Sequence, residues 1–184
     1  MRNEMRKSVI KTVSKAIALA SILSLTLLTG CTKSEDKVTV APDPVIIQNG
    51  EECDLCGMYI NRFPGPKGQV FERGGIPAKR FCSTRDMFAY ALQPEHKHRI
   101  EHIYVHDVAT AAWDSQENAQ YIDAKKALFV TGHKLQGAMG PALASFSKKA
   151  DAEKFIKENG GKILTFDEID IETISMMGHQ GMHH

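Results

Sequence analysis

Hydrophobic residues are unevenly distributed along the chain, and the strongest block lies near its start. Residues 16–28 form a predominantly apolar stretch of thirteen residues. This is short for a membrane-spanning helix, which needs about twenty. A basic head precedes the stretch, made of Arg2, Arg6, Lys7, Lys11 and Lys15. The layout predicts a secretory signal peptide over residues 1–30, and the alternative is a permanent N-terminal anchor helix.

The end of this segment, Leu28-Thr29-Gly30-Cys31, resembles a bacterial lipobox. The resemblance implies cleavage before Cys31 and attachment of a diacylglycerol to its thiol. Two or more acyl chains at this position would hold the protein stably on a membrane. The next residue is Thr32 rather than an aspartate, which favours the outer membrane, facing the periplasm. Residues 31–44 are polar and contain proline, so we expect a flexible lipidated tether.

Beyond the tether, residues 45–172 alternate between short strand-like and helical hydrophobic patterns. The spacing in Ser83-Thr84-Arg85-Asp86 is that of a capping box, which predicts the start of a helix that Pro94 would stop. A second helix is predicted over 148–158, because Asn159-Gly160-Gly161 is typical of a C-terminal cap. Strands are predicted over 45–47, 70–71, 103–108, 127–131 and 163–166.

A faint internal duplication is visible in the spacing of three residues. The matching sets are Phe81, Asp86 and Tyr90, and then Phe146, Asp151 and Phe155. Each set opens a predicted helix and follows a methionine in a glycine context, Met58 and Met139. The pattern fits an α+β fold of two related halves, in which the two methionines would approach each other across a pseudo-twofold axis. The alternative is coincidence, because three matched positions are few.

Composition and charge narrow the class of protein. The chain has 23 basic and 22 acidic residues and a net charge of +1. Without residues 1–30, a chain of 154 residues remains, with 18 basic and 21 acidic residues and a net charge of −3. That length is enough for one ordinary domain or for two small repeats with a shared core. The charge gives no indication of binding to DNA or RNA.

The cysteine count favours a reactive or metal-binding use. If Cys31 carries lipid, then Cys53, Cys56 and Cys82 remain. An odd number argues against a small disulfide-framework domain in an oxidising compartment. Cys53 and Cys56 could still form a disulfide or a redox pair with each other. No thioredoxin-like βαβ pattern surrounds them, however, so the redox interpretation is the weaker one.

Soft sulfur donors are concentrated at the front of the predicted domain. Cys53, Cys56 and Met58 lie within six residues, and Gly57 lets the backbone turn between them. Thiolate and thioether ligands select soft ions, above all Cu(I). Met139 lies in a glycine-framed loop, Gly137-Ala138-Met139-Gly140-Pro141, where an exposed methionine is unusual unless its sulfur is used; the alternative is a plain packing residue. The predicted Cu(I) ligands are therefore Cys53, Cys56, Met58 and Met139.

The remaining candidate ligands have simpler interpretations. Cys82 precedes a predicted helix cap and is interpreted as a small buried hydrophobic residue; as a third thiolate it could instead complete a zinc site. His106 stands next to Asp107, so a paired imidazole is possible. Residues 173–184 are a low-complexity tail that cannot form a core but could hold copper loosely. Possible auxiliary ligands are His106, Met176, Met177, His179, Met182, His183 and His184.

Over about residues 53–169, the ordered motifs resemble the NosL family of lipoproteins, accessory factors for nitrous oxide reductase. The motifs are Cys53-Asp54-Leu55-Cys56-Gly57-Met58, Phe81-Cys82-Ser83-Thr84-Arg85-Asp86-Met87-Phe88, Val105-His106-Asp107, Gly137-Ala138-Met139-Gly140-Pro141 and Leu164-Thr165-Phe166-Asp167-Glu168. The resemblance implies two small ββαβ-like halves, in agreement with the duplication. It carries the family's metal binding onto Cys53, Cys56, Met58 and Met139.

The resemblance also implies a function. A NosL protein would be a non-catalytic periplasmic Cu(I) chaperone, anchored to the membrane through its lipid. It would deliver copper to apo nitrous oxide reductase for the copper–sulfide centre, beside an ABC-type membrane complex. One alternative is a thiol–disulfide or organometal-processing enzyme that uses the cysteines, with Asp107 or another buried carboxylate as proton donor. Another is a structural zinc-binding lipoprotein.

Overall fold

The structure is a computed structural model that describes residues 41–75, 77–116 and 118–180, the last three of these by their backbone alone. The predicted signal peptide, the lipobox and most of the predicted tether lie outside the described residues, as do Met182, His183 and His184. In the part of the chain that is described, no helix is both long enough and apolar enough to cross a membrane.

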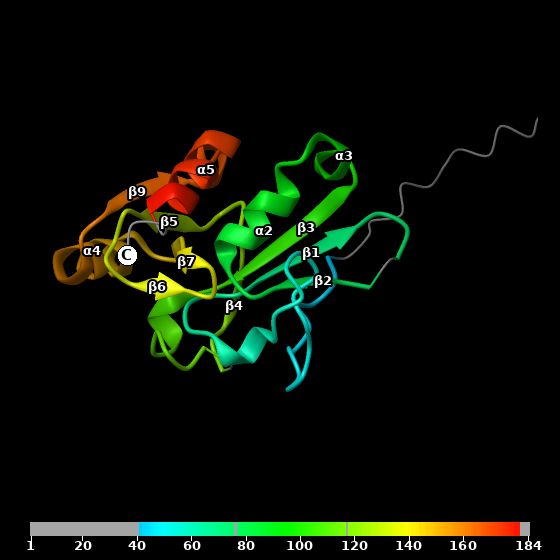
Figure 1. Ribbon diagram of the computed structural model, residues 1–184, viewed down its shortest axis with the longest axis horizontal. Coiled ribbons are helices and arrows are strands. Elements are labelled where there is room, and N and C mark those ends of the chain that lie inside the picture. Colours follow the sequence, from blue (N-terminus) through cyan, green and yellow to red (C-terminus); the bar gives the residue numbers. More distant parts are fainter. Residues whose placement is uncertain (1–40, 76, 117, 181–184) are drawn as a thin grey trace, which may run out of the picture. The chain divides into compact units, whose positions relative to one another are not determined.

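The first half of the fold is a four-stranded antiparallel sheet with one main helix (Figure 1). Its strands are β1 (Gly68–Glu72), β2 (Lys79–Phe81), β3 (Ile100–His106) and β4 (Tyr121–Asp123), in the order β2-β1-β3-β4. The helix α2 (Thr84–Ala91) connects β2 to β3, and the short helix α3 (Pro94–Lys97) follows it. Pro94 therefore ends the first helix, as predicted, and also begins the next one, where a missing N–H costs nothing.

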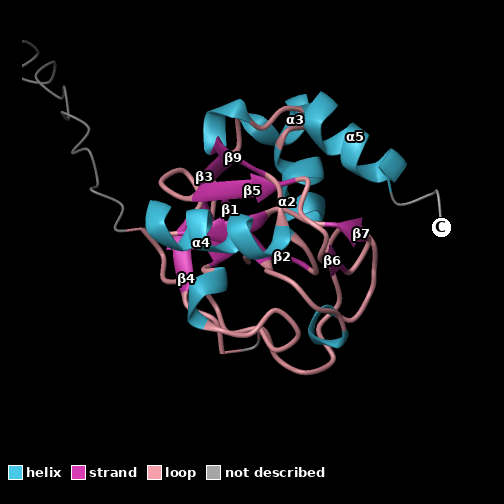
Figure 2. Cartoon of the chain, turned by 90° about the vertical axis from the view of Figure 1, so that its left-hand side faces the viewer, coloured by secondary structure: helices cyan, strands magenta, loops and turns pink. Residues whose placement is uncertain are grey.

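The second half repeats this arrangement with a three-stranded sheet (Figure 2). Its elements are β5 (Leu128–Thr131), β8 (Ala144–Phe146), α4 (Lys149–Asn159) and β9 (Lys162–Thr165), and its strand order is β8-β5-β9. In both halves the first strand lies between the second and the third, and all pairs are antiparallel. The expectation of two ββαβ halves is confirmed.

The duplication holds for the helix starts but not for the methionines. Phe81 and Phe146 each end the second strand of their half, two residues before the cap of the following helix. Met58, in contrast, precedes β1. Met139 lies in a hairpin inserted between β5 and β8, made of β6 (Gln136–Gly137) and β7 (Gly140–Pro141). The two methionines therefore do not occupy equivalent positions in the two halves, and their approach to each other stays a prediction.

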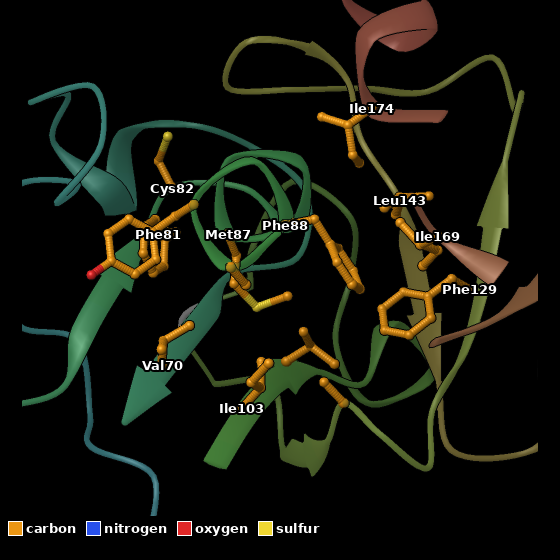
Figure 3. Packing of buried hydrophobic residues seen from close by; sticks show 14 of the residues in the cluster. Val70, Phe81, Cys82, Met87, Phe88, Ile103, Phe129, Leu143, Ile169 and Ile174 are labelled. Carbon is orange, nitrogen blue, oxygen red and sulfur yellow. The ribbon is translucent and has the colours of Figure 1, made fainter. Parts of the chain in front are cut away.

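One hydrophobic core joins the two halves (Figure 3). Phe88 of α2 packs edge-on against Phe129 of β5, with the ring centroids 5.1 Å apart. On the other side of α2, Met87 is fully buried, as the helical pattern predicts for a core residue. A Cβ atom on Gly68 of β1 would lie 2.5 Å from the Met87 sulfur. Glycine at this position therefore lets α2 approach the sheet closely.

The start of the described chain and its C-terminal tail differ from expectation. Residues 45–47 form no strand, because the buried amide of Gln69 bonds both the N–H and the carbonyl of Val45 in place of a strand ladder. The tail is not outside the core: it contains helix α5 (Ile171–Gln180), which buries Ile174 and Met177. Asp170 caps this helix by accepting from the Thr173 N–H, a start signal hidden by the methionine- and histidine-rich composition.

The remaining short elements are three 3-10 turns. They are η1 (Ile60–Arg62), η2 (Val108–Thr110) and η3 (Phe166–Glu168). The first of them follows directly on the Cys53–Met58 motif and anchors it, because Ile60 is fully buried in the shared core.

Candidate metal centre

Residues 53–58 fold into a tight turn, called the cysteine turn below. The Gly57 N–H bonds the Cys53 carbonyl, and the Cys53 N–H bonds the Met58 carbonyl, each at 2.9 Å. Gly57 has a φ of +72°, a conformation that residues with a Cβ rarely adopt. The glycine thus lets the chain return on itself, which brings the Cys53 and Cys56 side chains to one side of the turn.

The cysteine turn is docked on the edge strand β2. The Asp54 N–H donates to the Arg80 carbonyl at 2.9 Å, and the Arg80 N–H donates to Asp54 Oδ2 at 2.7 Å. This pairing satisfies backbone groups of an edge strand that would otherwise face solvent. Since β2 ends at Phe81, the next residue, Cys82, arrives beside the turn. A cysteine remote in sequence is in this way added to the Cys53–Cys56 pair.

The start of α2 supplies a carboxylate to the same place. The Ser83 hydroxyl caps the helix by accepting from the Asp86 N–H at 3.0 Å, which confirms the predicted helix start. Asp86 is buried, with its side chain turned back toward Cys82. The buried ammonium of Lys67 donates to the Cys82 carbonyl at 3.2 Å and holds that residue's backbone.

Four side chains converge at this point. The Cys56 and Cys82 sulfur atoms are 3.5 Å apart, Asp86 Oδ2 lies 3.3 Å from Cys82 Sγ, and it lies 3.9 Å from Cys53 Sγ. The ligand atoms of all four residues lie within 4.8 Å of one another. No disulfide joins the cysteines. Sulfur atoms at about this separation fit around one ion, because a metal–thiolate bond is about 2.3 Å long.

The electrostatics of the three thiols differ. A hydrogen bond with the Cys82 side chain lowers the pKa of Cys53 to about 5, against the opposing effect of burial. Burial raises the pKa of Cys56. The same hydrogen bond with Cys53, together with burial, raises the pKa of Cys82 far above its usual range. Of the three thiols, Cys53 therefore loses its proton most readily and Cys82 least readily, and a bound metal ion would displace the proton of Cys82.

Comparison with known proteins identifies the family. The NosL family profile matches residues 44–174. The chain belongs to the NosL family. It is 41% identical over 168 residues to the copper-binding lipoprotein NosL of Stutzerimonas stutzeri, covering 90% of this chain and 87% of that protein. It is 34% identical over 149 residues to the copper-binding lipoprotein NosL of Achromobacter cycloclastes, covering 79% and 76%.

A solved structure supports the family fold. The crystal structure of the copper chaperone NosL from Shewanella denitrificans matches with a TM-score of 0.69 at 42% identity. The match covers 72% of this chain and 99% of that one. The arrangement of two ββαβ halves described above is thus the fold of a NosL-family protein.

The structure adds two residues to the site expected from the sequence. Cys82, interpreted as a small hydrophobic residue or, in the alternative, as a third thiolate, is fully buried and also contacts Cys56 and Asp86. Asp86 was expected only as part of a helix cap. A usable signal was the four-residue spacing of Cys82 and Asp86 around a helix start, which places both at the same end of the helix. Only the docking of the cysteine turn on β2 shows that this end meets Cys53 and Cys56.

The two predicted thioether ligands lie on different elements, Met58 in the cysteine turn and Met139 in the β6–β7 hairpin of the second half. Met58 ends the turn and is partly buried. Met139, 42% exposed, occupies the tip of the β6–β7 hairpin. The chain after this hairpin is fastened to the start of α2, because Thr84 Oγ1 donates to the Leu143 carbonyl at 2.7 Å. Coordination by the two sulfur atoms stays a prediction.

His106 and Asp107 do not form the expected pair. His106 is buried against the Tyr121 ring, whose centroid is 4.3 Å away. Asp107 instead accepts from the Ser147 N–H and hydroxyl, and from the Ala109 N–H. It fastens the start of α4 to the first half. The buried carboxylate at the thiols is Asp86, so a proton-donor role for Asp107 in thiol chemistry has no support.

Of the auxiliary candidates in the tail, Met176 is exposed and Met177 is buried in the core. Both line a pocket of about 270 Å³ with Thr131, Gly132, Gly161, Lys162 and Thr173. His179 lies within α5, among the residues described by their backbone alone.

Proposed function

We propose that this NosL-family protein is a non-catalytic carrier of Cu(I) in the bacterial envelope. The observation that carries the proposal is the cluster of three free cysteines at the cysteine turn and the start of α2. Thiolates select soft ions, and Cu(I) needs few of them. The names of the relatives from Stutzerimonas stutzeri, Achromobacter cycloclastes and Shewanella denitrificans support copper as the metal.

The ligands differ in their suitability for Cu(I). Cys56 and Cys82 already lie 3.5 Å apart, and Cys53 belongs to the same cluster. The thioethers of Met58 and Met139 are the proposed additional donors, because they are soft and uncharged. Asp86 is a hard oxygen donor, which Cu(I) disfavours. Its contribution in a copper-loaded centre is an electrostatic one.

The exposure of the centre supports transfer rather than storage. Cys53, Cys82 and Asp86 are buried, whereas Cys56 is partly exposed. Ligands of an acceptor would attack the ion from the Cys56 side, and copper would move by ligand exchange. The proposed acceptor is apo nitrous oxide reductase, which needs copper for its copper–sulfide centre, with an ABC-type membrane complex as a further partner. A lipid on Cys31 would keep the carrier on the periplasmic face of a membrane, the outer one being favoured.

The test is an anaerobic Cu(I) titration of the protein against a competing chelator, with X-ray absorption of the loaded form. We expect copper–sulfur scattering, and an affinity at least about 100-fold lower in a Cys56→Ser, Met58→Leu double variant. The control is Glu153→Gln, which changes an exposed side chain of α4 that is no candidate ligand. An unchanged affinity in the double variant, or spectra without copper–sulfur scattering, would refute the proposal.

The carboxylate in the cluster favours one second candidate, a structural zinc site. Three thiolates and Asp86 would make a closed tetrahedral set of four ligands, which zinc accepts. Metal analysis of the protein as purified separates the candidates. One zinc ion per chain that Cu(I) cannot displace would favour the structural site, and exchangeable copper the carrier.

A further inference from the structure

The cysteine turn is held together by bonds of its own. Its two internal hydrogen bonds join Cys53 to Gly57 and to Met58. The base below it is closed by a hydrogen bond from the Ile60 N–H to the Glu51 carbonyl at 2.9 Å. Ile60 is fully buried and fixes this base in the core. The cysteine turn can therefore move as a unit while its base, Glu51 and Ile60, stays in place.

Cys53 anchors the turn in the core, and the other contacts that attach it to β2 are partly exposed and involve carboxylates. Besides its two backbone contacts with Arg80, Asp54 pairs with the Lys79 ammonium at 3.4 Å. Glu51 pairs with the Arg80 guanidinium at 2.6 Å. The four side chains are between 25% and 32% exposed. Ion pairs in such surroundings are weak because water competes with them, so this attachment breaks more easily than the core does.

The opposite side of the centre is fixed. Cys82 is fully buried, and its carbonyl is bonded by the buried Lys67. Asp86 belongs to α2, which is packed in the core. A movement of the cysteine turn would separate Cys56 from Cys82 and expose Cys53, which is 3% exposed in the docked state.

We propose that the cysteine turn is a latch that undocks from β2, and that Asp54 is the positioning residue that keeps it closed. Undocking divides the cluster between a moving part, Cys53 and Cys56, and a fixed part, Cys82 and Asp86. An ion coordinated by residues of both parts would hold the latch closed. When the latch opens, the ion would keep contact with the ligands of one part only. The consequence for copper rests on the proposed function, whereas undocking is measurable without metal.

The experiment is alkylation of the metal-free protein with iodoacetamide, with the extent at each cysteine followed by mass spectrometry. Asp54→Ala removes the acceptor for the Arg80 N–H and the partner of Lys79. We expect Cys53 to react about tenfold faster in this variant, as loss of a hydrogen bond and an exposed ion pair implies, while urea unfolding of the domain stays nearly unchanged.

Two control variants separate docking from charge. Asp54→Asn removes the negative charge but keeps an oxygen that can accept from Arg80, so we expect a smaller acceleration than in Asp54→Ala. Glu153→Gln removes a carboxylate from the exposed ion pair with Lys149 on α4 and should leave Cys53 unchanged. Equal acceleration in Asn and Ala variants would assign the effect to charge and overturn the latch.

The remaining outcomes also decide the question. An unchanged Cys53 rate in Asp54→Ala would show that Asp54 does not hold the turn. A matching loss of stability in urea unfolding would show general loosening of the fold, which also contradicts a local latch. With copper bound, Asp54→Ala should release the ion to a chelator faster than the wild type does. If the wild type binds no Cu(I) through sulfur, the proposed function fails while the alkylation result stands.

Discussion

At the scale of single residues, two buried histidines make the protein sensitive to acid. Burial lowers the pKa of His106 to about 3, and the nearby positive charge of Lys67 adds to this effect. Burial lowers the pKa of His133, which packs against Trp113 and Phe155, to about 4. Both side chains are thus neutral in the folded protein at neutral pH. His106 contributes packing rather than a positive charge.

The sign of the pH dependence follows from these pKa values. The unfolded chain takes up a proton at each histidine near pH 6.5, but the folded chain does so only near pH 3 to 4. The unfolded state binds more protons in between, so stability is full above about pH 6.5 and is lost as the pH falls. We expect a loss of up to about 1.4 kcal/mol per pH unit for each histidine.

Urea unfolding of the metal-free protein between pH 7 and pH 4 measures this loss. His106→Phe should give a flatter dependence of the unfolding free energy on pH. A dependence as steep as that of the wild type would show that His106 is not the responsible group.

At the scale of elements, the position of the metal centre depends on how closely α2 lies on β1. Gly68 allows this approach, because any Cβ atom there would collide with Met87. The collision would push the helix away from the sheet. The start of that helix carries Asp86, and Cys82 precedes it, so the geometry of the cluster would change with it.

Gly68→Ala should therefore lower the unfolding free energy by about 1–3 kcal/mol, the usual cost of overpacking a core. Truncation of the colliding side chain in a Gly68→Ala, Met87→Ala double variant should cost less than the two single changes together. Urea unfolding of the three variants tests this coupling. Additive effects would mean that Gly68 and Met87 do not share the contact.

At the scale of the whole molecule, the described domain should unfold as one unit. The two ββαβ halves share a core in which Phe88 of the first packs on Phe129 of the second. Asp107 and Thr84 add polar connections from the first half to Ser147 and Leu143 in the second. If one half unfolded, the other half would expose its apolar side of this core to water and would lose stability.

Phe129→Leu should destabilise both halves together, by about 1–2 kcal/mol. The single tryptophan, Trp113, packs on His133 and Phe155 and so reports on the second half by fluorescence. Far-UV circular dichroism reports on both halves. We expect the two denaturant transitions to coincide in the wild type and in the variant. A fluorescence transition that precedes the other would show that the second half unfolds alone.

The sequence by itself determined the features that depend on neighbouring residues. The Ser83 cap, the stop at Pro94 and the helix before Gly160 are local signals, and each was found where predicted. The spacing around Phe81 and Phe146 indicated the two halves for the same reason. The pairing of Cys53 with Cys56 within one turn also follows from local spacing, with Gly57 supplying the turn.

Only the tertiary structure decided which distant residues meet. Cys82 and Asp86 join the cysteine turn because Asp54 docks that turn on β2, a contact between segments 26 residues apart that no local pattern encodes. The burial of Met177 and the neutral burial of His106 were likewise set by long-range packing, since composition marked both as candidate ligands. The tendency to form a helix, a cap or a turn depends on adjacent residues. A metal centre is assembled from distant side chains that the folded core brings together.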